Sequence, residues 1–170
     1  MAAAELYQVS LLASSFLSTT VFGELLIFYL IVMPGIGLLP DGDFLRGFQV
    51  MDGLIQNNEP TFVAVWVGSI VAVVTTLVSG CFELTGAKLA ALVLGSAAYV
   101  LGQITTFTIN VPRNNRVKTL DIPNLSDFEK KRERDFFEPT WNKWNLFRVA
   151  LFGLASIDFL WLLLLAHPEI

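Results

Sequence analysis

Four long apolar stretches constrain this chain more than any other feature of its sequence. A helix needs about twenty mostly apolar residues to cross the hydrocarbon core of a bilayer, because lipid offers the backbone no other hydrogen-bond partner. The sequence therefore predicts an all-α fold, a four-transmembrane-helix bundle. The expected helices span about residues 9–33, 61–80, 89–110 and 140–166.

Composition supports one membrane domain over residues 1–170. The chain is 54% hydrophobic and 15% charged, whereas roughly a quarter of the residues of a soluble domain are charged. Cys81 and His167 are the single cysteine and the single histidine. One thiol and one imidazole supply neither a disulfide nor the usual ligand sets of zinc, copper, iron or haem. The sequence therefore predicts no metal site and no cofactor.

The connections differ in character. Residues 43–56 place apolar side chains on one stripe at helical spacing but are too short to span, which predicts an amphipathic surface helix. Such a helix is either a lid over the bundle or a passive connector, and both readings stay open. The stripe consists of Phe44, Leu45, Phe48, Met51, Leu54 and Ile55.

The third connection, residues 111–143, is long and charged, and it carries eight of the eleven lysines and arginines. By the positive-inside rule this connection is cytoplasmic and both termini lie on the non-cytoplasmic side of an integral, multi-pass membrane protein. Its run "FEKKRERDFF" mixes both signs, which favours a solvated helical face over nucleic-acid binding. Membrane lipid is therefore an expected partner, and nucleic acid is not.

Prolines mark the expected helix ends. Pro60 and Pro139 suit the first turns of the second and fourth helices. In "TINVPRNNRV", residues 108–117, Pro112 predicts that the third helix stops near Asn110. Asn110 then either caps that helix end or lines a pocket.

Ionisable residues within the apolar segments ask for a partner or a function, because lipid disfavours charge. Glu24 lies about 13 Å inside its helix and Gln103 about 10 Å inside the third, so the two are at similar depth. Polar stripes on the third and fourth helices reach the same layer. Their members are Gln103, Thr106 and Asn110 on one helix, and Trp141, Asn145 and Arg148 on the other.

We therefore expect a polar pocket with Glu24 at its floor. Asn110, Asn114 and Asn115 would line its mouth, facing Arg148. Alternatives stay open: Arg148 snorkels towards headgroups, or Glu24 is a protonated carboxyl bonded to a neighbouring helix.

Several motifs resemble those of the anthrone oxygenase-like family, whose members are small four-helix membrane proteins. They are "FGELLIFYLIVMPG", "FQVMDGLIQNNEPTF", "INVPRNN" and "WNKWNLFR". The chain departs from the pattern at Asp52, where asparagine is common in the family.

The resemblance implies oxidation of a flat, hydrophobic, anthrone-like or phenolic substrate by molecular oxygen, without metal or flavin. A buried carboxylate would remove a proton and donors would stabilise the oxyanion. Glu24 is the candidate base, with Asn110 and Arg148 as donors. Gln103, Thr106, Asn114, Asn145 and Trp141 are the candidate substrate-binding residues.

A second function of a different class remains open. The same polar layer would suit a non-catalytic membrane subunit, or a lipid- or quinone-binding protein with partner subunits in a larger complex. A closed pocket reachable from one face or from the bilayer favours the enzyme. A layer filled by bonds between side chains favours the subunit.

Overall fold

The computed structural model describes residues 3–57 and 59–166, and His167 lies outside this part of the chain. All the regular structure in the described part is helical. The elements are α1 (Ala3–Ile27), η1 (Phe28–Val32), α2 (Met33–Gly37), α3 (Asp41–Gln56), α4 (Pro60–Glu83), α5 (Gly86–Thr105), η2 (Thr106–Asn110), α6 (Val111–Lys118), η3 (Ile122–Asn124) and α7 (Asp127–Ala166).

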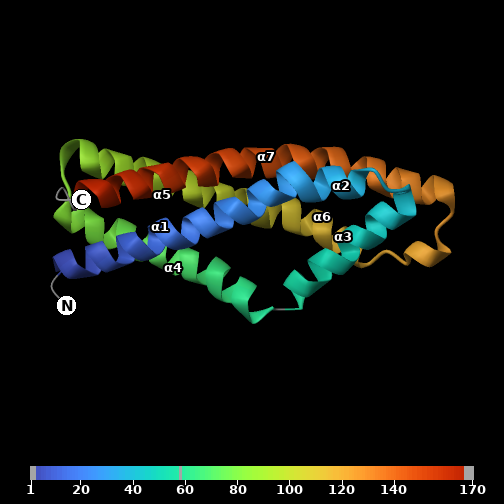
Figure 1. Cartoon of the computed structure of the whole chain (residues 1–170), viewed down its shortest axis with the longest axis horizontal. Coiled ribbons are helices and arrows are strands. Elements are labelled where there is room, and N and C mark those ends of the chain that lie inside the picture. Colours follow the sequence, from blue (N-terminus) through green and yellow to red (C-terminus); the bar gives the residue numbers. More distant parts are fainter. Residues whose placement is uncertain (1–2, 58, 167–170) are drawn as a thin grey trace.

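Three long rods and one shorter helix form the bundle (Figure 1). The rods are α1–η1–α2, α5–η2–α6 and α7, and the shorter helix is α4. The start of α1, the end of α7 and the α4–α5 connection lie at one end, whereas α2, α3 and η3 lie towards the other. Four helical segments are long and apolar enough to cross a membrane. The predicted all-α bundle is confirmed, and the chain is a multi-pass membrane protein.

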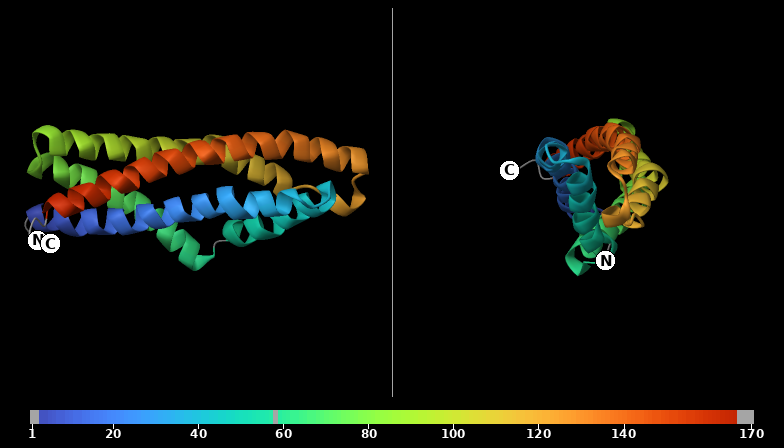
Figure 2. Two further views of the ribbon diagram at one scale, coloured as in Figure 1. Left: turned by 45° about the horizontal axis from the view of Figure 1, so that its top comes forward. Right: turned by 90° about the vertical axis from the view of Figure 1, so that its right-hand side faces the viewer.

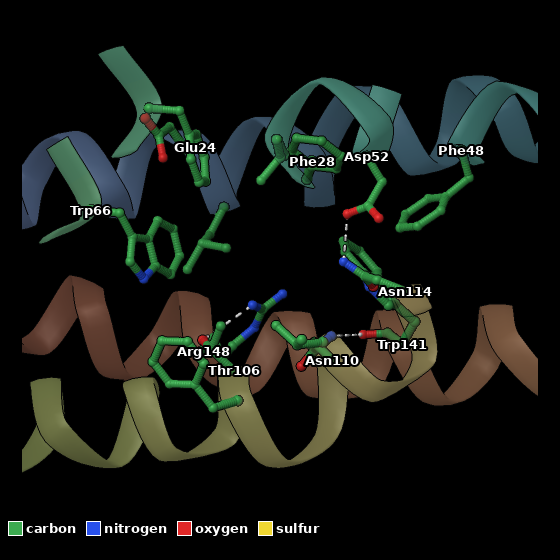
Figure 3. Close-up of a pocket in the computed structure, with 15 residues that line it drawn as sticks. Glu24, Phe28, Phe48, Asp52, Trp66, Thr106, Asn110, Asn114, Trp141 and Arg148 are labelled. Carbon is green, nitrogen blue, oxygen red and sulfur yellow. Dashed lines mark hydrogen bonds between the residues drawn. The ribbon is translucent and has the colours of Figure 1, made fainter. Parts of the chain in front are cut away.

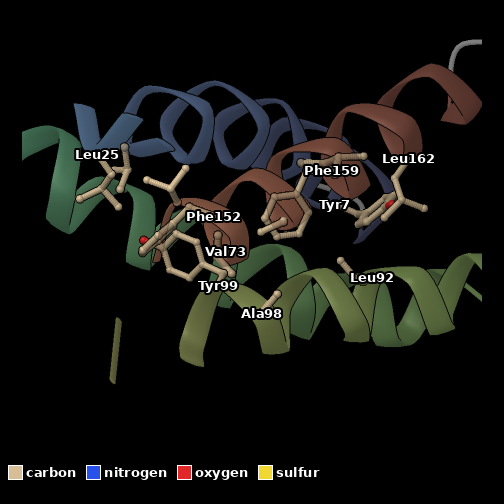
Figure 4. Close-up of a cluster of buried hydrophobic side chains, with 13 residues drawn as sticks. Tyr7, Leu25, Val73, Leu92, Ala98, Tyr99, Phe152, Phe159 and Leu162 are labelled. Atoms are coloured by element: carbon tan, nitrogen blue, oxygen red, sulfur yellow. The ribbon is translucent and has the colours of Figure 1, made fainter. Parts of the chain in front are cut away.

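The core near the chain ends is apolar and tightly packed (Figure 4). Phe152 and Phe159 of α7 are fully buried, and Phe152 packs edge to face against Tyr99 of α5. Glycines let the helices approach closely: a Cβ added at Gly80 would lie 2.3 Å from Leu92, and one at Gly102 would lie 2.7 Å from the Phe152 ring. Small residues at these contacts are the usual means of packing helices in lipid.

Two π-helical segments carry the rods past prolines. In η1 the Met33 N–H donates to the Phe28 carbonyl, and in η2 the Val111 N–H donates to the Thr106 carbonyl; Pro34 and Pro112 follow one residue later. A proline ring clashes with the carbonyl four residues earlier, and a π turn relieves this by rerouting the backbone bonds. The predicted end of the third helix near Asn110 is therefore wrong, because the rod continues to Lys118.

The fourth helix also begins earlier than predicted. α7 starts at Asp127 rather than near residue 140, and Pro139 lies inside it rather than in its first turn. Ser126 and Glu129 form a capping box: the Glu129 N–H donates to Ser126 Oγ, and the Ser126 N–H donates to Glu129 Oε2. The expected third connection, residues 111–143, is consequently mostly helical.

Beyond the bundle, α2, α3, α6, η3 and the part of α7 up to Trp141 form what we call the extension. It has its own core, in which Phe48 lies 4.5 Å from Phe137 and 5.6 Å from Trp141 between ring centroids. The amphipathic helix is confirmed as α3, with Phe44, Leu45 and Phe48 buried. Leu54, predicted for the same stripe, is 66% exposed.

Polar contacts fasten α3 and the α2–α3 connection. Gln49 Nε2 lies 3.1 Å from the carbonyl oxygens of Val117, Lys118 and Leu120 at the end of α6. Arg134 of α7 donates to the Gly37 and Leu39 carbonyls and pairs with Asp41. These contacts hold α3 over the end of the bundle. α4 diverges from the other helices towards its N-terminal end, which lies near the C-terminal end of α3 (Figure 2).

Candidate functional site

A partly enclosed cavity of about 220 Å³ lies where the bundle meets the extension. It is bounded by α1 and η1, by α3, by the N-terminal half of α4, by η2 with α6, and by α7. The divergence of α4 and the two π turns are located around this space. The helices are thus farther apart around the cavity than in the glycine-packed core.

Apolar and aromatic side chains form most of the wall. A cavity of roughly 150 Å³ holds one benzene molecule, so this one has room for a flat aromatic of more than one ring. Phe62 and Trp66 of α4 stack with their ring centroids 5.3 Å apart. The apolar lining residues are Leu25, Phe28, Phe48, Ile55, Phe62, Trp66, Phe107, Val111 and Trp141.

Glu24 of α1 lies on the wall at the same end of the cavity as Trp66 (Figure 3). Its carboxylate atom Oε2 is buried and has no hydrogen-bond partner within the described residues. A buried acceptor without a partner is costly to fold. It is therefore a group that a ligand donor or a transferred proton would satisfy.

Arg148 of α7 brings a cation to the opposite wall. It is 4% exposed, and Figure 3 shows its guanidinium pointing into the space between the rods. Nη1 donates to Thr106 Oγ1 at 3.3 Å and Nη2 donates to Asn145 Oδ1 at 2.9 Å, whereas Nε is buried without a partner. No carboxylate of the described residues forms an ion pair with it. Arg148 therefore does not snorkel to the membrane surface.

Asn110 lies beside Arg148 on the wall made by η2. It is 1% exposed, its Nδ2 lies 3.4 Å from the Trp141 carbonyl oxygen, and its Oδ1 is buried without a partner. Its side chain forms no capping bond. Asn110 therefore lines the cavity in the middle of a continuous rod rather than capping a helix end.

A chain of amide and carboxylate groups closes the other end of the cavity. Trp141 Nε1 donates to Asn114 Oδ1 at 2.8 Å, and Asn114 Nδ2 donates to Asp52 Oδ1 at 2.7 Å. Asp52 Oδ2 accepts from Gln56. Burial raises the pKa of the Asp52 carboxyl above its ordinary 3.8, and the hydrogen bonds from Gln56 and Asn114 and the charge of Lys118 oppose that rise.

The structure brings six of the eight predicted site residues to the cavity. They are Glu24, Thr106, Asn110, Asn114, Trp141 and Arg148. The other two lie behind its wall. Gln103 accepts from Trp66 Nε1 and donates to Tyr99, and Asn145 donates to the Leu25 carbonyl while it holds Arg148. Asn115, expected at the mouth, is exposed and does not line the cavity.

Sequence reasoning missed Asp52 and the aromatic walls. Asp52 is the only acidic residue within the apolar stripe of α3, and it is 6% exposed, so a carboxylate on the buried face was the available signal. The lining aromatics carried no such signal, because apolar residues in a membrane helix face lipid, core or ligand with the same pattern. Within the described residues no three His, Cys, Asp or Glu side chains are grouped so as to hold a metal ion.

The fold and the site describe a four-span helical membrane protein with an aromatic-walled cavity that a carboxylate, an amide and a guanidinium line. The family model for anthrone oxygenase matches residues 59–157, more than half of the chain. The chain therefore belongs to the anthrone oxygenase family. No curated protein and no solved structure matches it.

Proposed function

We propose that this protein is a membrane oxygenase that oxidises a flat, hydrophobic anthrone-like or phenolic substrate with molecular oxygen. The observation that carries the proposal is the set of three buried polar atoms without partners, on Glu24, Asn110 and Arg148, whose side chains line one aromatic cavity. The family match supports the same reaction class. The aromatic walls suit a planar substrate.

Glu24 is the proposed base. An anthrone carries an acidic CH₂ group conjugated through its rings to the carbonyl, and loss of one proton from that carbon gives an electron-rich enolate. The unpartnered Oε2 of Glu24 accepts that proton. A positioned carboxylate is a common general base for the removal of such a proton.

Arg148 is the proposed oxyanion stabiliser. The enolate oxygen carries negative charge, and a buried guanidinium without a carboxylate partner provides preorganised positive charge for it. Thr106 and Asn145 hold the two terminal nitrogens, so Nε and the remaining N–H groups are left for a ligand. The Asn110 amide lies on the same wall and orients the substrate.

Molecular oxygen is the co-reactant. The enolate passes an electron to O₂, and the two radicals combine to form a C–O bond at the former CH₂ carbon. The resulting peroxide anion takes back the proton held by Glu24, which gives a hydroperoxide and regenerates the carboxylate. The hydroperoxide then loses water as the O–O bond breaks and the remaining C–H proton leaves. The carbon ends as a quinone carbonyl, with one oxygen atom in the product and the other in water.

Replacement of Glu24 by Gln tests the proposal. Purified protein in vesicles is given anthrone, and anthraquinone formation and oxygen uptake are measured above the spontaneous rate with heat-denatured protein. Loss of a general base lowers turnover by roughly a hundredfold or more, and we expect a fall of this size. Glu83→Gln is the matched control, because Glu83 is an exposed carboxylate at the far end of α4 and its loss should leave turnover unchanged.

Two outcomes would contradict the proposal. Full turnover in Glu24→Gln removes Glu24 as the base. A wild-type protein that binds anthraquinone but oxidises nothing points to the second candidate, a quinone-binding protein. The amide and guanidinium groups at the cavity favour that candidate, since they would donate to quinone carbonyls as readily as to an enolate oxygen.

The proposal includes an orientation. The extension carries most of the lysines and arginines, which places it on the cytoplasmic side by the positive-inside rule and both chain ends on the other side. Protease treatment of oriented vesicles checks this, because cleavage after Lys130 or Lys131 should occur only from the cytoplasmic face. Substrate, oxygen and membrane lipid are then the proposed partners, and further membrane subunits are not required.

A further inference from the structure

Phe107 has an unusual position, because it lines the cavity and is also 54% exposed. It belongs to η2, within the apolar span Gly86–Lys118. Its neighbour one turn back, Ile104, is 52% exposed. Large apolar side chains exposed within such a span face lipid. Phe107 therefore touches the cavity on one side and the bilayer on the other.

The two ends of the cavity are closed. On the side of the extension, the bonds from Asn114 to Asp52 and from Gln49 to the end of α6 hold α3 against α6. On the side of the bundle core, Tyr99 and Phe152 pack edge to face and are fully buried. Neither end offers a flat aromatic an open route.

The side of the cavity between α4 and η2, which we call the flank, is held less tightly than the two ends. The hydrogen bond from Trp66 to Gln103 ties α4 to α5 just below the cavity. Towards Pro60, no side-chain hydrogen bond of the described residues joins α4 to η2 or α6, and α4 diverges from the bundle (Figure 1). Phe62 lies on this diverging part and lines the cavity. The flank is thus bordered by Phe62 and Phe107, whose side chains can move without breaking a polar contact.

The depth of this flank suits an aromatic that carries polar groups. Phe62 lies in the first turn of its membrane helix, and Phe107 precedes the polar residues Asn110 and Asn114 by one to two turns. The flank is therefore near the boundary between acyl chains and headgroups. Amphipathic rings gather at that level, with their apolar body in lipid and their polar edge near water. On the side of the extension next to this flank, α3 exposes Val50 and Leu54.

We propose that the ligand of this cavity, a planar aromatic carrying carbonyl or hydroxyl groups, enters sideways from the bilayer between Phe62 of α4 and Phe107 of η2. We call this opening the lateral portal. A ligand dissolved in the membrane then reaches Glu24 and Arg148 without crossing the aqueous phase or the closed extension. The inference concerns access to the cavity and holds whether the bound molecule is oxidised or only held.

A cross-link over the lateral portal tests the proposal. In a background of Cys81→Ser, Trp144→Phe and Trp161→Phe, the remaining tryptophans are Trp66 and Trp141, which both line the cavity. Phe62→Cys and Phe107→Cys are added and joined by a cleavable bis-maleimide. Anthraquinone is supplied in vesicles, and the quenching of tryptophan fluorescence reports binding without requiring turnover.

We expect the cross-link to slow the binding of anthraquinone at least tenfold, and cleavage of the linker in the same sample to restore it. The rate in the open protein should follow the mole fraction of anthraquinone in the lipid rather than its total concentration. A matched cross-link between Phe16→Cys and Leu160→Cys, which line a separate outer groove, should leave the rate unchanged. Phe107→Trp, which adds bulk without a cross-link, should slow binding less.

Equal rates with the linker intact and cleaved would overturn the proposal, as would a rate set by the aqueous concentration. Absence of quenching in the open protein would overturn it too, since the cavity would then take no ligand of this class. Binding of anthraquinone without oxidation of anthrone would leave the lateral portal standing while the proposed oxygenase fails.

Discussion

The two halves of the bundle treat polar groups in opposite ways. In the half that carries the chain ends, the polar side chains are short: most hydroxyls donate to carbonyls of their own helix, as Ser15 does to Leu11, and a few also bond across helices, as Ser14 does to Thr76. In the half that carries the cavity, long polar side chains reach between helices. Arg148 bonds to Thr106 and to its helix neighbour Asn145, which in turn bonds to the Leu25 carbonyl.

The polar groups of the two halves serve different purposes. A hydroxyl bonded within its helix lets two helices approach and requires nothing further. Buried atoms left without a partner, such as Glu24 Oε2 and Arg148 Nε, each cost roughly 1–3 kcal/mol of stability. Ser96 Oγ in the packing half is also buried without a partner, but among the described residues only around the cavity do several such atoms, on Glu24, Asn110 and Arg148, line one space that a ligand would fill. The first half is thus built for packing and the second for a ligand.

Arg148→Met should have the largest effect, and it distinguishes a role of Arg148 in ligand binding from a role in packing. Loss of a single oxyanion donor lowers turnover by about a hundred- to a thousandfold, and we expect a fall in anthrone oxidation of that order. Stability should stay the same or rise, because a buried cation without a carboxylate partner is removed. Anthrone turnover and the thermal unfolding midpoint are measured together.

The control for this prediction is Arg132→Met, an exposed arginine on the same helix, which should alter neither quantity. A protein with Arg148→Met that unfolds at a much lower temperature would show that Arg148 holds the fold. The contrast between the two halves would then fail.

Gly102→Ala tests the packing half and should have the next largest effect. Its new Cβ would lie 2.7 Å from the buried Phe152 ring, and overpacking of this kind costs about 1–3 kcal/mol. Gly23→Ala is the matched control, since a Cβ there meets nothing within 4 Å. That change should be neutral or stabilise the helix by up to about 1 kcal/mol. Equal unfolding free energies for both variants would contradict the tight packing.

Much of this contrast was already present in the sequence. The apolar lengths predict four spans, and the helical spacing of Gln103, Thr106 and Asn110 predicts one polar face. Glu24 and Arg148 are predicted to share a cavity because lipid disfavours an idle charge. Rise per residue is regular enough that depth along a helix transfers from sequence to structure.

The rest depends on long-range contacts that spacing does not encode. The depth along the helix predicts Gln103 at the level of Glu24. In the structure, the rotation of α5 about its axis directs the Gln103 side chain to Trp66 and Tyr99, behind the cavity wall. Pro112 predicts a helix end, whereas a π turn continues the rod past it, as another does past Pro34. The early start of α7 did have a local signal in the sequence, the capping box of Ser126 and Glu129, whereas Pro139 suits a later helix start.

Asp52→Asn tests how the stability of the cavity half depends on pH and should have a smaller effect. Burial raises the pKa of Asp52 in the folded chain, so the folded state holds this proton more tightly than the unfolded state. The resulting stability is present below the ordinary pKa of 3.8 and is lost as pH rises through the folded pKa. The wild type should therefore lose stability relative to Asp52→Asn as pH rises from about 3.5 to neutrality.

Thermal unfolding midpoints of both proteins at several pH values check this, and we expect their difference to shift by a few degrees. Asp43→Asn, on the same helix and outside the cavity lining, is the control and should track the wild type. A difference that does not vary with pH, or that favours the wild type at neutral pH, would show that the hydrogen bonds from Asn114 and Gln56 outweigh burial.

The smallest effect is expected in the packing half, between Ser14 and Thr76. Their hydroxyls lie 2.8 Å apart across α1 and α4, and the Thr76 hydroxyl also donates to the Ala72 carbonyl of its own helix. Hydrogen bonds between membrane helices contribute about 0.6 kcal/mol on average, so a double-mutant cycle of Ser14→Ala and Thr76→Val should give a coupling of that order. The same cycle on Asp52 and Asn114 should give a larger one, because bonds to a charged group contribute about 1.5–3 kcal/mol. Unfolding in mixed micelles measures both cycles, and a Ser14–Thr76 coupling as large as the other would mean that both halves depend equally on their polar contacts.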